Sequence, residues 1–131
     1  MTPKSAAEIM TRTVVTVSPD TPLTKVIELL IRHSISATPV VDDANTLVGI
    51  ISEIDLINFA LSGEAGNSLV SDAMTREVIA FPPDAPCPVI ANCFAQKRLR
   101  RVPIVENGKL IGLVSRRDIL RQMLILYNTP K

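Results

Sequence analysis

The stretch Gly49-Ile50-Ile51-Ser52-Glu53-Ile54-Asp55 returns later in the chain as Gly112-Leu113-Val114-Ser115-Arg116-Arg117-Asp118. In each copy the aliphatic pair is typical of the end of a buried strand. The Ser-x-x-Asp pattern that follows predicts the start of a helix, with serine at the N-cap and aspartate at N3. Free backbone N–H groups at the positive end of a helix dipole then lie beside a hydroxyl and a carboxylate. The sequence therefore predicts two sites able to hold a phosphate and a ribose, against the alternative of two ordinary helix caps.

The duplication extends over most of the chain. Met10-Thr11-Arg12 recurs 64 residues later as Met74-Thr75-Arg76, and Pro39-Val40-Val41 recurs at the same offset as Pro103-Ile104-Val105. From Leu47 onward the offset is 63, so one residue is lost in a turn, where a structural repeat tolerates it. We expect one repeat over residues 1–62, a linker over 63–68 and a second repeat over 69–131, which together form one intertwined module.

Each repeat predicts the element order helix, strand, helix, strand, strand, helix. In the first repeat we expect a helix at 6–10, a strand at 14–17, a helix capped by Thr21 with Pro22 at N1, strands at 39–41 and 47–51, and a helix from Ser52 through Leu61. The second repeat predicts a helix at 70–74, a strand at 78–81, a helix from Pro86, strands at 102–105 and 110–114, and a final helix to about 127. The predicted fold class is α/β (α+β): two repeats related by a pseudo-twofold axis, each a three-stranded sheet packed with helices.

Composition excludes several classes of protein. The 131 residues are 47% hydrophobic, which suggests an oligomer interface in addition to a core. The net charge of +1 gives no global field to recruit nucleic acid or membrane. No apolar run is long enough to span a bilayer, and no apolar signal segment follows Met1, so we expect a cytoplasmic protein. Cys87 and Cys93 are expected to be reduced core residues, and His33 a cation at a helix C-terminus.

The ordered and repeated set of motifs resembles a tandem pair of cystathionine β-synthase (CBS) domains, from about Ala7 to Leu124. The resemblance is carried by the two Met-Thr pairs, the Pro-Asp-x-Pro segments at 19–22 and 83–86, the strands at 39–41 and 103–105, and the two stretches quoted above. It implies a sensor of adenosyl ligands, in which the motif aspartate holds ribose hydroxyls and the motif serine lies near phosphate or ribose. It also implies that residues before the strands at 39–41 and 103–105 close the cleft of the other repeat.

The resemblance implies two unequal clefts. The residues of the first are Ser52, Asp55, Ile79, Arg100, Arg101 and Arg117; those of the second are Thr13, Val15, Ser36, Ala37, Ser115 and Asp118. Arg100 and Arg101 occupy the positions matched by Ser36 and Ala37, and guanidinium groups meet phosphate oxygens in bidentate fashion. We therefore expect phosphorylated nucleotides to prefer the first cleft. The second suits an adenosine-like ligand, including S-adenosylmethionine, or stays empty.

Three functions remain open. The first is a regulatory module that binds AMP, ADP, ATP or S-adenosylmethionine as an effector, needs no cofactor, and signals through a homodimer or an unidentified protein partner. An enzyme is disfavoured because the sequence offers no nucleophile–base pair, metal-ligand cluster or phosphate-binding loop. The third is a ligand-free interaction or dimerisation module whose motifs serve only as helix caps. The arginines of the second repeat are alternatively a solvated face or a weak nucleic-acid patch, although no stacking aromatic accompanies them.

Overall fold

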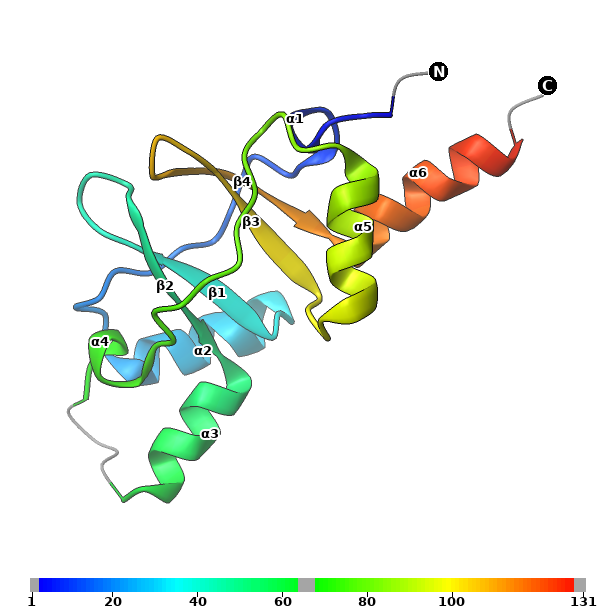
Figure 1. Ribbon diagram of the computed structural model, residues 1–131. Coiled ribbons are helices and arrows are strands. Elements are labelled where there is room, and N and C mark those ends of the chain that lie inside the picture. The colour runs from blue at the N-terminus through cyan, green and yellow to red at the C-terminus, as the bar shows by residue number, and fades with distance from the viewer. Residues whose placement is uncertain (1–2, 64–67, 129–131) are drawn as a thin grey trace. The chain divides into compact units, whose positions relative to one another are not determined.

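The computed structural model of the chain describes residues 3–63 and 68–128 (Figure 1). The chain forms two compact units: Val15–Val78, which we call the central unit, and Met1–Val14 with Ile79–Lys131, which we call the terminal unit. Each unit contains a two-stranded antiparallel sheet and helices, in agreement with the predicted mixed fold class. Within the expected linker at 63–68, residues 64–67 lie outside the described residues.

The central unit is built around the hairpin of β1 (Ala37–Val41) and β2 (Leu47–Ser52). Its helices are α2 (Leu23–His33), α3 (Glu53–Leu61) and the short α4 (Val70–Ala73). Apolar side chains at helical spacing on α2 meet the buried face of the hairpin. The core consists of Val17, Leu23, Val26, Leu30, Val40, Ile51 and Val70.

The terminal unit repeats this arrangement with the hairpin of β3 (Arg101–Glu106) and β4 (Lys109–Ser115). Its helices are α1 (Ala6–Ile9), α5 (Cys87–Gln96) and α6 (Arg116–Asn128). Backbone hydrogen bonds tie the N-terminal segment to this unit, among them those from Ala6 N to Ala85 O and from Thr11 N to Leu113 O, both at 2.8 Å. The core consists of Ala6, Ala85, Cys87, Ile90, Val102, Ile104, Val114 and Ile119.

The strands expected at 14–17 and 78–81 are much shorter than predicted. Val17 makes one parallel bridge to Val40, and Phe81 makes one to Ile104. In the central unit, Val17 N donates to Pro39 O at 3.2 Å and Val41 N donates to Val17 O at 2.9 Å. To extend the ladder back toward residues 15 and 79, Pro39 and Pro103 of the partner strands would have to donate an N–H, which proline lacks. Val15 O instead accepts from the Thr38 hydroxyl at 2.6 Å. The third strand of each predicted sheet is therefore reduced to a single paired residue.

The predicted cap of α2 is also wrong. Pro22, not Thr21, occupies the N-cap position of the helix. The Thr21 hydroxyl oxygen instead accepts a hydrogen bond from Ser18 N at 3.0 Å, one turn earlier in the chain. Threonine hydroxyls stabilise turns of this kind as readily as helix starts, so the Thr-Pro pattern alone could not separate the two.

The structure confirms Cys87 as a core residue and places His33 at the end of α2, whereas Cys93 lies outside the core of the terminal unit. Cys87 is buried, Cys93 is half-buried, and both are free thiols. Burial raises the pKa of the Cys87 thiol, which keeps it protonated and unreactive. His33 lies in the last turn of α2, where a cation interacts favourably with the helix dipole.

The glycine that opens each Ser-x-x-Asp stretch is required by close approach of another segment. A Cβ added at Gly49 would lie 2.8 Å from Thr75 O and 2.9 Å from Met74 Sδ. At Gly112 it would meet Met10 Sδ and Thr11 O in the same way. The repeated Met-Thr pair therefore packs on the repeated glycine. This contact accounts for the recurrence of both motifs, since a side chain at the glycine position would collide with the Met-Thr pair.

We expect Gly49→Ala to lower the free energy of unfolding by about 1–3 kcal/mol, because the methyl group forces a shift of the Thr75 backbone. Urea denaturation followed by circular dichroism measures the change. Gly112→Ala is the matched variant in the terminal unit and should change stability in the same direction. An unchanged midpoint for Gly49→Ala would contradict the packing of Met74 and Thr75 on β2.

Candidate functional site

Ser52 and Asp55 form a reciprocal cap where β2 passes into α3. Asp55 N donates to Ser52 Oγ at 3.1 Å, and Ser52 N donates to Asp55 Oδ2 at 2.9 Å. The Ser52 hydroxyl also donates to Asp55 Oδ2 at 2.9 Å. The other carboxylate oxygen, Oδ1, accepts from the hydroxyl of Thr75 at 3.0 Å. The predicted positions of serine at N-cap and aspartate at N3 are confirmed.

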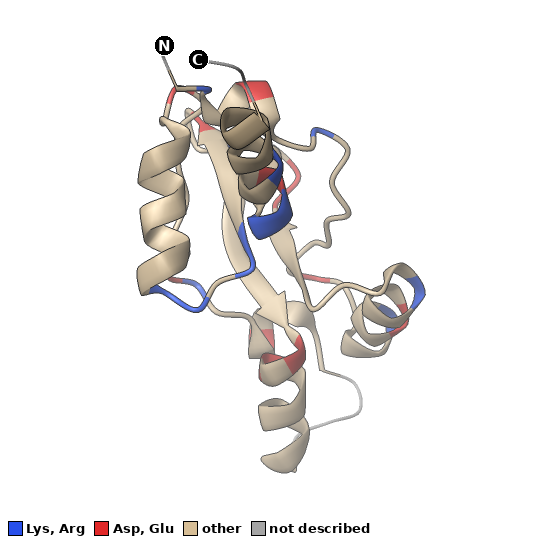
Figure 2. Ribbon diagram, turned by 90° about the vertical axis from the view of Figure 1, so that its right-hand side faces the viewer, with Lys and Arg blue, Asp and Glu red and all other residues tan. Residues whose placement is uncertain are grey.

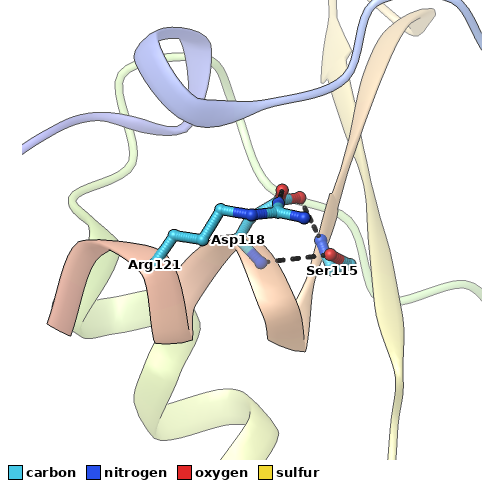
Figure 3. A network of polar contacts seen from close by, with 3 residues as sticks. All are labelled: Ser115, Asp118 and Arg121. Carbon is cyan, nitrogen blue, oxygen red and sulfur yellow. Dashed lines mark hydrogen bonds and ion pairs between the residues drawn. The ribbon is translucent and has the colours of Figure 1, made fainter. Parts of the chain in front are cut away.

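The second copy forms the same cap where β4 passes into α6. Asp118 N donates to Ser115 Oγ at 3.2 Å, and Ser115 N donates to Asp118 Oδ2 at 2.8 Å. Here Oδ1 accepts from the guanidinium of Arg121 at 2.9 Å. Figure 3 shows the Asp118 and Arg121 side chains, both from α6, directed toward one another, with Ser115 at the helix start. In the second copy the carboxylate Oδ1 atom is thus bonded to a guanidinium, whereas in the first copy it is bonded to a hydroxyl.

Each unit also places the residues at the start of the first strand of its hairpin beside its own motif. In the central unit, Glu53 N donates to Ser36 O at 2.9 Å, and Ala37 is the β-sheet partner of Ser52. In the terminal unit, arginines occupy the corresponding positions. Arg116 N donates to Arg100 O at 3.0 Å, and Arg101 is the sheet partner of Ser115.

The predicted clefts combine residues of different units. Ser52 and Asp55 belong to the central unit, whereas their expected companions Ile79, Arg100, Arg101 and Arg117 belong to the terminal unit. Ser115, Asp118 and Thr13 belong to the terminal unit, whereas Val15, Ser36 and Ala37 belong to the central unit. Ile79, Thr13 and the three arginines are exposed. The two clefts, which combine residues of both units, stay predictions. The structure describes the contacts that these residues make within their own unit.

Basic residues gather around the start of α6. Figure 2 shows Lys and Arg on the segment between α5 and β3, on the beginning of β3, and on the first turn of α6. One of them, Arg116, is held in place because its Nε donates to Leu99 O. Cations at a helix N-terminus oppose the helix dipole, so this arrangement stabilises α6 less than acidic residues would. A positive helix end with added guanidinium groups attracts anions.

Two residues of the site, Thr75 and Arg121, were not predicted from the sequence. Arg121 lies three residues after Asp118, a spacing at which helical side chains meet, so the sequence did contain a usable signal. Thr75 lies 20 residues from Asp55 in the sequence, and no local spacing predicts that contact. The sequence feature that pointed to Thr75 was the recurrence of the Met-Thr pair.

Residues 3–63 and 68–128 contain neither a group of three metal-ligating side chains nor a helix suited to crossing a membrane. Within these ranges no three His, Cys, Asp or Glu side chains are grouped to hold a metal ion. No helix in the same ranges has the length and apolar character needed to cross a membrane. The groups present at the two motifs are hydroxyl, carboxylate, guanidinium and backbone N–H groups.

Solved structures with the same fold include two that contain adenosyl ligands. CBSX2, a CBS-pair protein from Arabidopsis thaliana, has been solved in complex with AMP; it is 27% identical, with a TM-score of 0.86 over 95% of this chain and 99% of that chain. The CBS domain pair of protein MJ0100 has been solved with 5′-methylthioadenosine and S-adenosyl-L-methionine. It is 25% identical, with a TM-score of 0.79 over 92% of this chain and 96% of that chain.

Sequence relatives are mostly longer proteins. The chain spans 13% to 41% of the length of four curated relatives that it matches, which include inosine-5′-monophosphate dehydrogenases from Methanocaldococcus jannaschii and Halobacterium salinarum. The CBS domain-containing protein YhcV from Bacillus subtilis is 30% identical over 116 residues, which cover 88% of this chain and 82% of that protein. The profile of the CBS domain matches residues 6–62 and again 70–125. The chain therefore belongs to the CBS domain family, as a tandem pair.

Proposed function

We propose that the chain is a regulatory module, without catalytic activity of its own, that binds an adenosyl ligand at its Ser-x-x-Asp motifs. The observation that carries the proposal is the intact geometry of both motifs, in which serine and aspartate are fixed at a helix start. The complexes of CBSX2 with AMP and of MJ0100 with 5′-methylthioadenosine and S-adenosyl-L-methionine support this class of ligand.

The chemistry of the two motifs suits a ribose. A carboxylate offers about four lone pairs, and its oxygens accept hydrogen bonds from vicinal hydroxyl groups. The reciprocal cap already fixes the orientation of Asp55 and Asp118, so little conformational entropy is lost when a ligand binds. Most backbone N–H groups at the starts of α3 and α6 already have acceptors: those of residues 52, 53 and 55, and of 115, 116 and 118, all donate within the chain. A phosphate or another negative group is therefore favoured by the positive end of each helix dipole rather than by free donors.

A thermal-shift screen of the whole chain tests the proposal. We expect adenosine, AMP, ATP or S-adenosylmethionine to raise the melting temperature, because a ligand that binds only the folded state stabilises it by mass action. NAD, which contains an adenosyl group, is screened with them, and guanosine monophosphate, which lacks adenine, serves as the comparison ligand. If none of the adenosyl compounds shifts the transition at millimolar concentration, the ligand-binding proposal is wrong.

Single-motif variants show which motif takes a phosphorylated ligand. The predicted preference for Asp55 depends on Arg100 and Arg101 serving the other repeat, although their backbones lie beside Ser115. Titration of AMP into Asp55→Ala and Asp118→Ala distinguishes the two arrangements. A larger loss in Asp55→Ala supports the predicted preference, and a larger loss in Asp118→Ala assigns the arginines to their own motif.

A second candidate function is ligand-free association through exposed apolar helix faces. On α3, Ile54, Ile57 and Leu61 are exposed, and on α6 so are Leu120, Met123 and Leu124. Other apolar residues of these two helices are occupied within the chain: Ile119 is buried, and Leu56 and Phe59 pack against the core of the central unit. Exposed apolar side chains in such numbers are typical of an interaction surface.

We therefore propose that two copies associate through α3 and α6 whether or not ligand binds, and that the dimer or a protein partner transmits the signal. Analytical ultracentrifugation should give twice the mass of one chain. Leu120→Lys with Leu124→Lys should shift the mass to that of one chain, since both side chains are about 60% exposed and their replacement disturbs no core. A wild-type protein that sediments as a single chain up to 100 µM, roughly the range of weak dimers, would contradict association.

A further inference from the structure

The two motif aspartates differ in how accessible their free oxygen is. Asp118 is buried, with a side chain only 11% exposed, whereas Asp55 is half-buried. In Asp118 the Oδ1 atom is paired with the Arg121 guanidinium at 2.9 Å. In Asp55 the same atom accepts from the neutral hydroxyl of Thr75 at 3.0 Å. A ligand hydroxyl therefore meets a cation at one motif and a neutral group at the other.

The repeat supplies a matched position for Arg121. The offset of 63 residues that relates Asp55 to Asp118 places Asn58 of α3 at the position of Arg121. Asparagine carries no charge, so the first motif has no equivalent ion pair. The presence of an ion pair at the second motif and its absence at the first therefore depend on one residue in each repeat, Arg121 or Asn58.

The Arg121 side chain lies mostly in solvent on α6. Its side chain is 68% exposed, and its guanidinium is anchored to the carboxylate at one point in the described geometry. Because the guanidinium lies in solvent although the carboxylate is buried, water and salt reach the pair from one side and weaken it. A ligand can therefore replace the guanidinium as the partner of Asp118. Because the ligand must first break the ion pair, its affinity is lowered.

We infer that Arg121 is a specificity-determining residue: it competes with ligand hydroxyl groups for Asp118 and so makes the second motif the weaker site for a neutral nucleoside. The inference rests on the proposed function, because it assumes that the motif aspartates hold a ligand. A neutral nucleoside must displace the guanidinium without offering it another anion. The first motif, with Asn58, has no cation to displace, and its ligand exchanges only the neutral hydroxyl of Thr75.

Calorimetric titration with adenosine tests the inference in an Asp55→Ala background, in which only the second motif remains. Adenosine is the probe because it is uncharged, so salt acts on the protein and not on the ligand. Adding Arg121→Asn should raise the affinity about two- to fivefold, the equivalent of the ion pair that the ligand no longer breaks. In the same background, raising the salt concentration from 50 mM to 500 mM should increase the affinity when Arg121 is present and leave it unchanged in Arg121→Asn.

Two control variants separate competition from a general effect of charge or stability. Arg98→Asn removes one exposed positive charge from the same unit and should leave adenosine affinity unchanged. Asn58→Arg, made in an Asp118→Ala background, introduces the competing cation at the first motif and should lower affinity there. A purely structural role for Arg121 would change the melting temperature and leave these affinities as they were.

Equal adenosine affinity with and without Arg121, in protein that binds through Asp118, would overturn the inference and leave the proposed function intact. The inference is also overturned if the Asp55→Ala protein binds no adenosine with either residue at position 121 while the Asp118→Ala protein does. If neither these variants nor the wild-type chain bind adenosine, AMP or S-adenosylmethionine, the proposed function fails as well.

Discussion

Asp55→Ala is expected to weaken the binding of an adenosyl ligand at the first motif about 10- to 100-fold. Hydrogen bonds to a charged group contribute roughly 1.5–3 kcal/mol, and alanine removes the carboxylate that would accept them from the ribose. The substitution also removes half of a helix cap, since Ser52 N loses its acceptor. Fluorescence or calorimetric titration with AMP measures the affinity, and thermal denaturation measures the cost of the lost cap.

Asp72 provides a matched control for the loss of the cap. Its carboxylate accepts from Leu69 N at 2.9 Å at the start of α4, in the same unit, but no serine completes a Ser-x-x-Asp motif there. Asp72→Ala should therefore lower stability by about 0.5–2 kcal/mol, as cap removal does, and leave ligand affinity unchanged. Equal losses of affinity in Asp55→Ala and Asp72→Ala would mean that binding responds to stability alone, and the role assigned to Asp55 would be wrong.

Ile90→Ala is expected to lower the free energy of unfolding by about 2–5 kcal/mol. Ile90 is completely buried in the core of the terminal unit, where α5 meets the sheet. Its truncation removes apolar area and leaves a cavity that the hairpin of β3 and β4 can only partly fill. This is a large part of the 5–15 kcal/mol that stabilises a typical domain. Urea denaturation followed by circular dichroism gives the change.

The neighbouring residue Val89 supplies the comparison. Its side chain is 49% exposed on the same helix, so Val89→Ala removes little buried area and should change stability by about 0.5 kcal/mol or less. A loss in Val89→Ala as large as that in Ile90→Ala would show that α5 presents a different face to the core. The pair therefore tests the orientation of α5 as well as the size of the effect.

Much of the fold follows from local patterns in the sequence. The apolar spacing of α2 and α5, the β-branched hairpins and the Ser-x-x-Asp helix starts all form as predicted, because each depends on residues within one turn or one hairpin. The two wrong predictions, the cap of α2 and the third strand of each sheet, also came from local patterns. Thr21 binds Ser18 instead of capping α2, and the segments at Val17 and Phe81 pair through one residue each, because local alternatives and nearby prolines outweigh the pattern.

Only part of the candidate site could be predicted from local sequence patterns. The serine and aspartate of each motif were predictable, since their spacing encodes a cap, and Arg121 could have been predicted from its distance along α6. Contact between Thr75 and Asp55 depends on how the chain returns to Gly49, which no short pattern records. The combination of residues from the two units depends on tertiary arrangement, so it stays a prediction from the family resemblance.

The central claim is that the motif aspartates bind an adenosyl ligand, and one calorimetric comparison tests it most directly. Nucleotide-free wild-type protein and the double variant Asp55→Ala/Asp118→Ala are each titrated with AMP and with S-adenosylmethionine. The account predicts saturable binding of at least one of them to the wild type and no measurable binding to a folded double variant. Undiminished binding by the double variant, or none by the wild type, would contradict it.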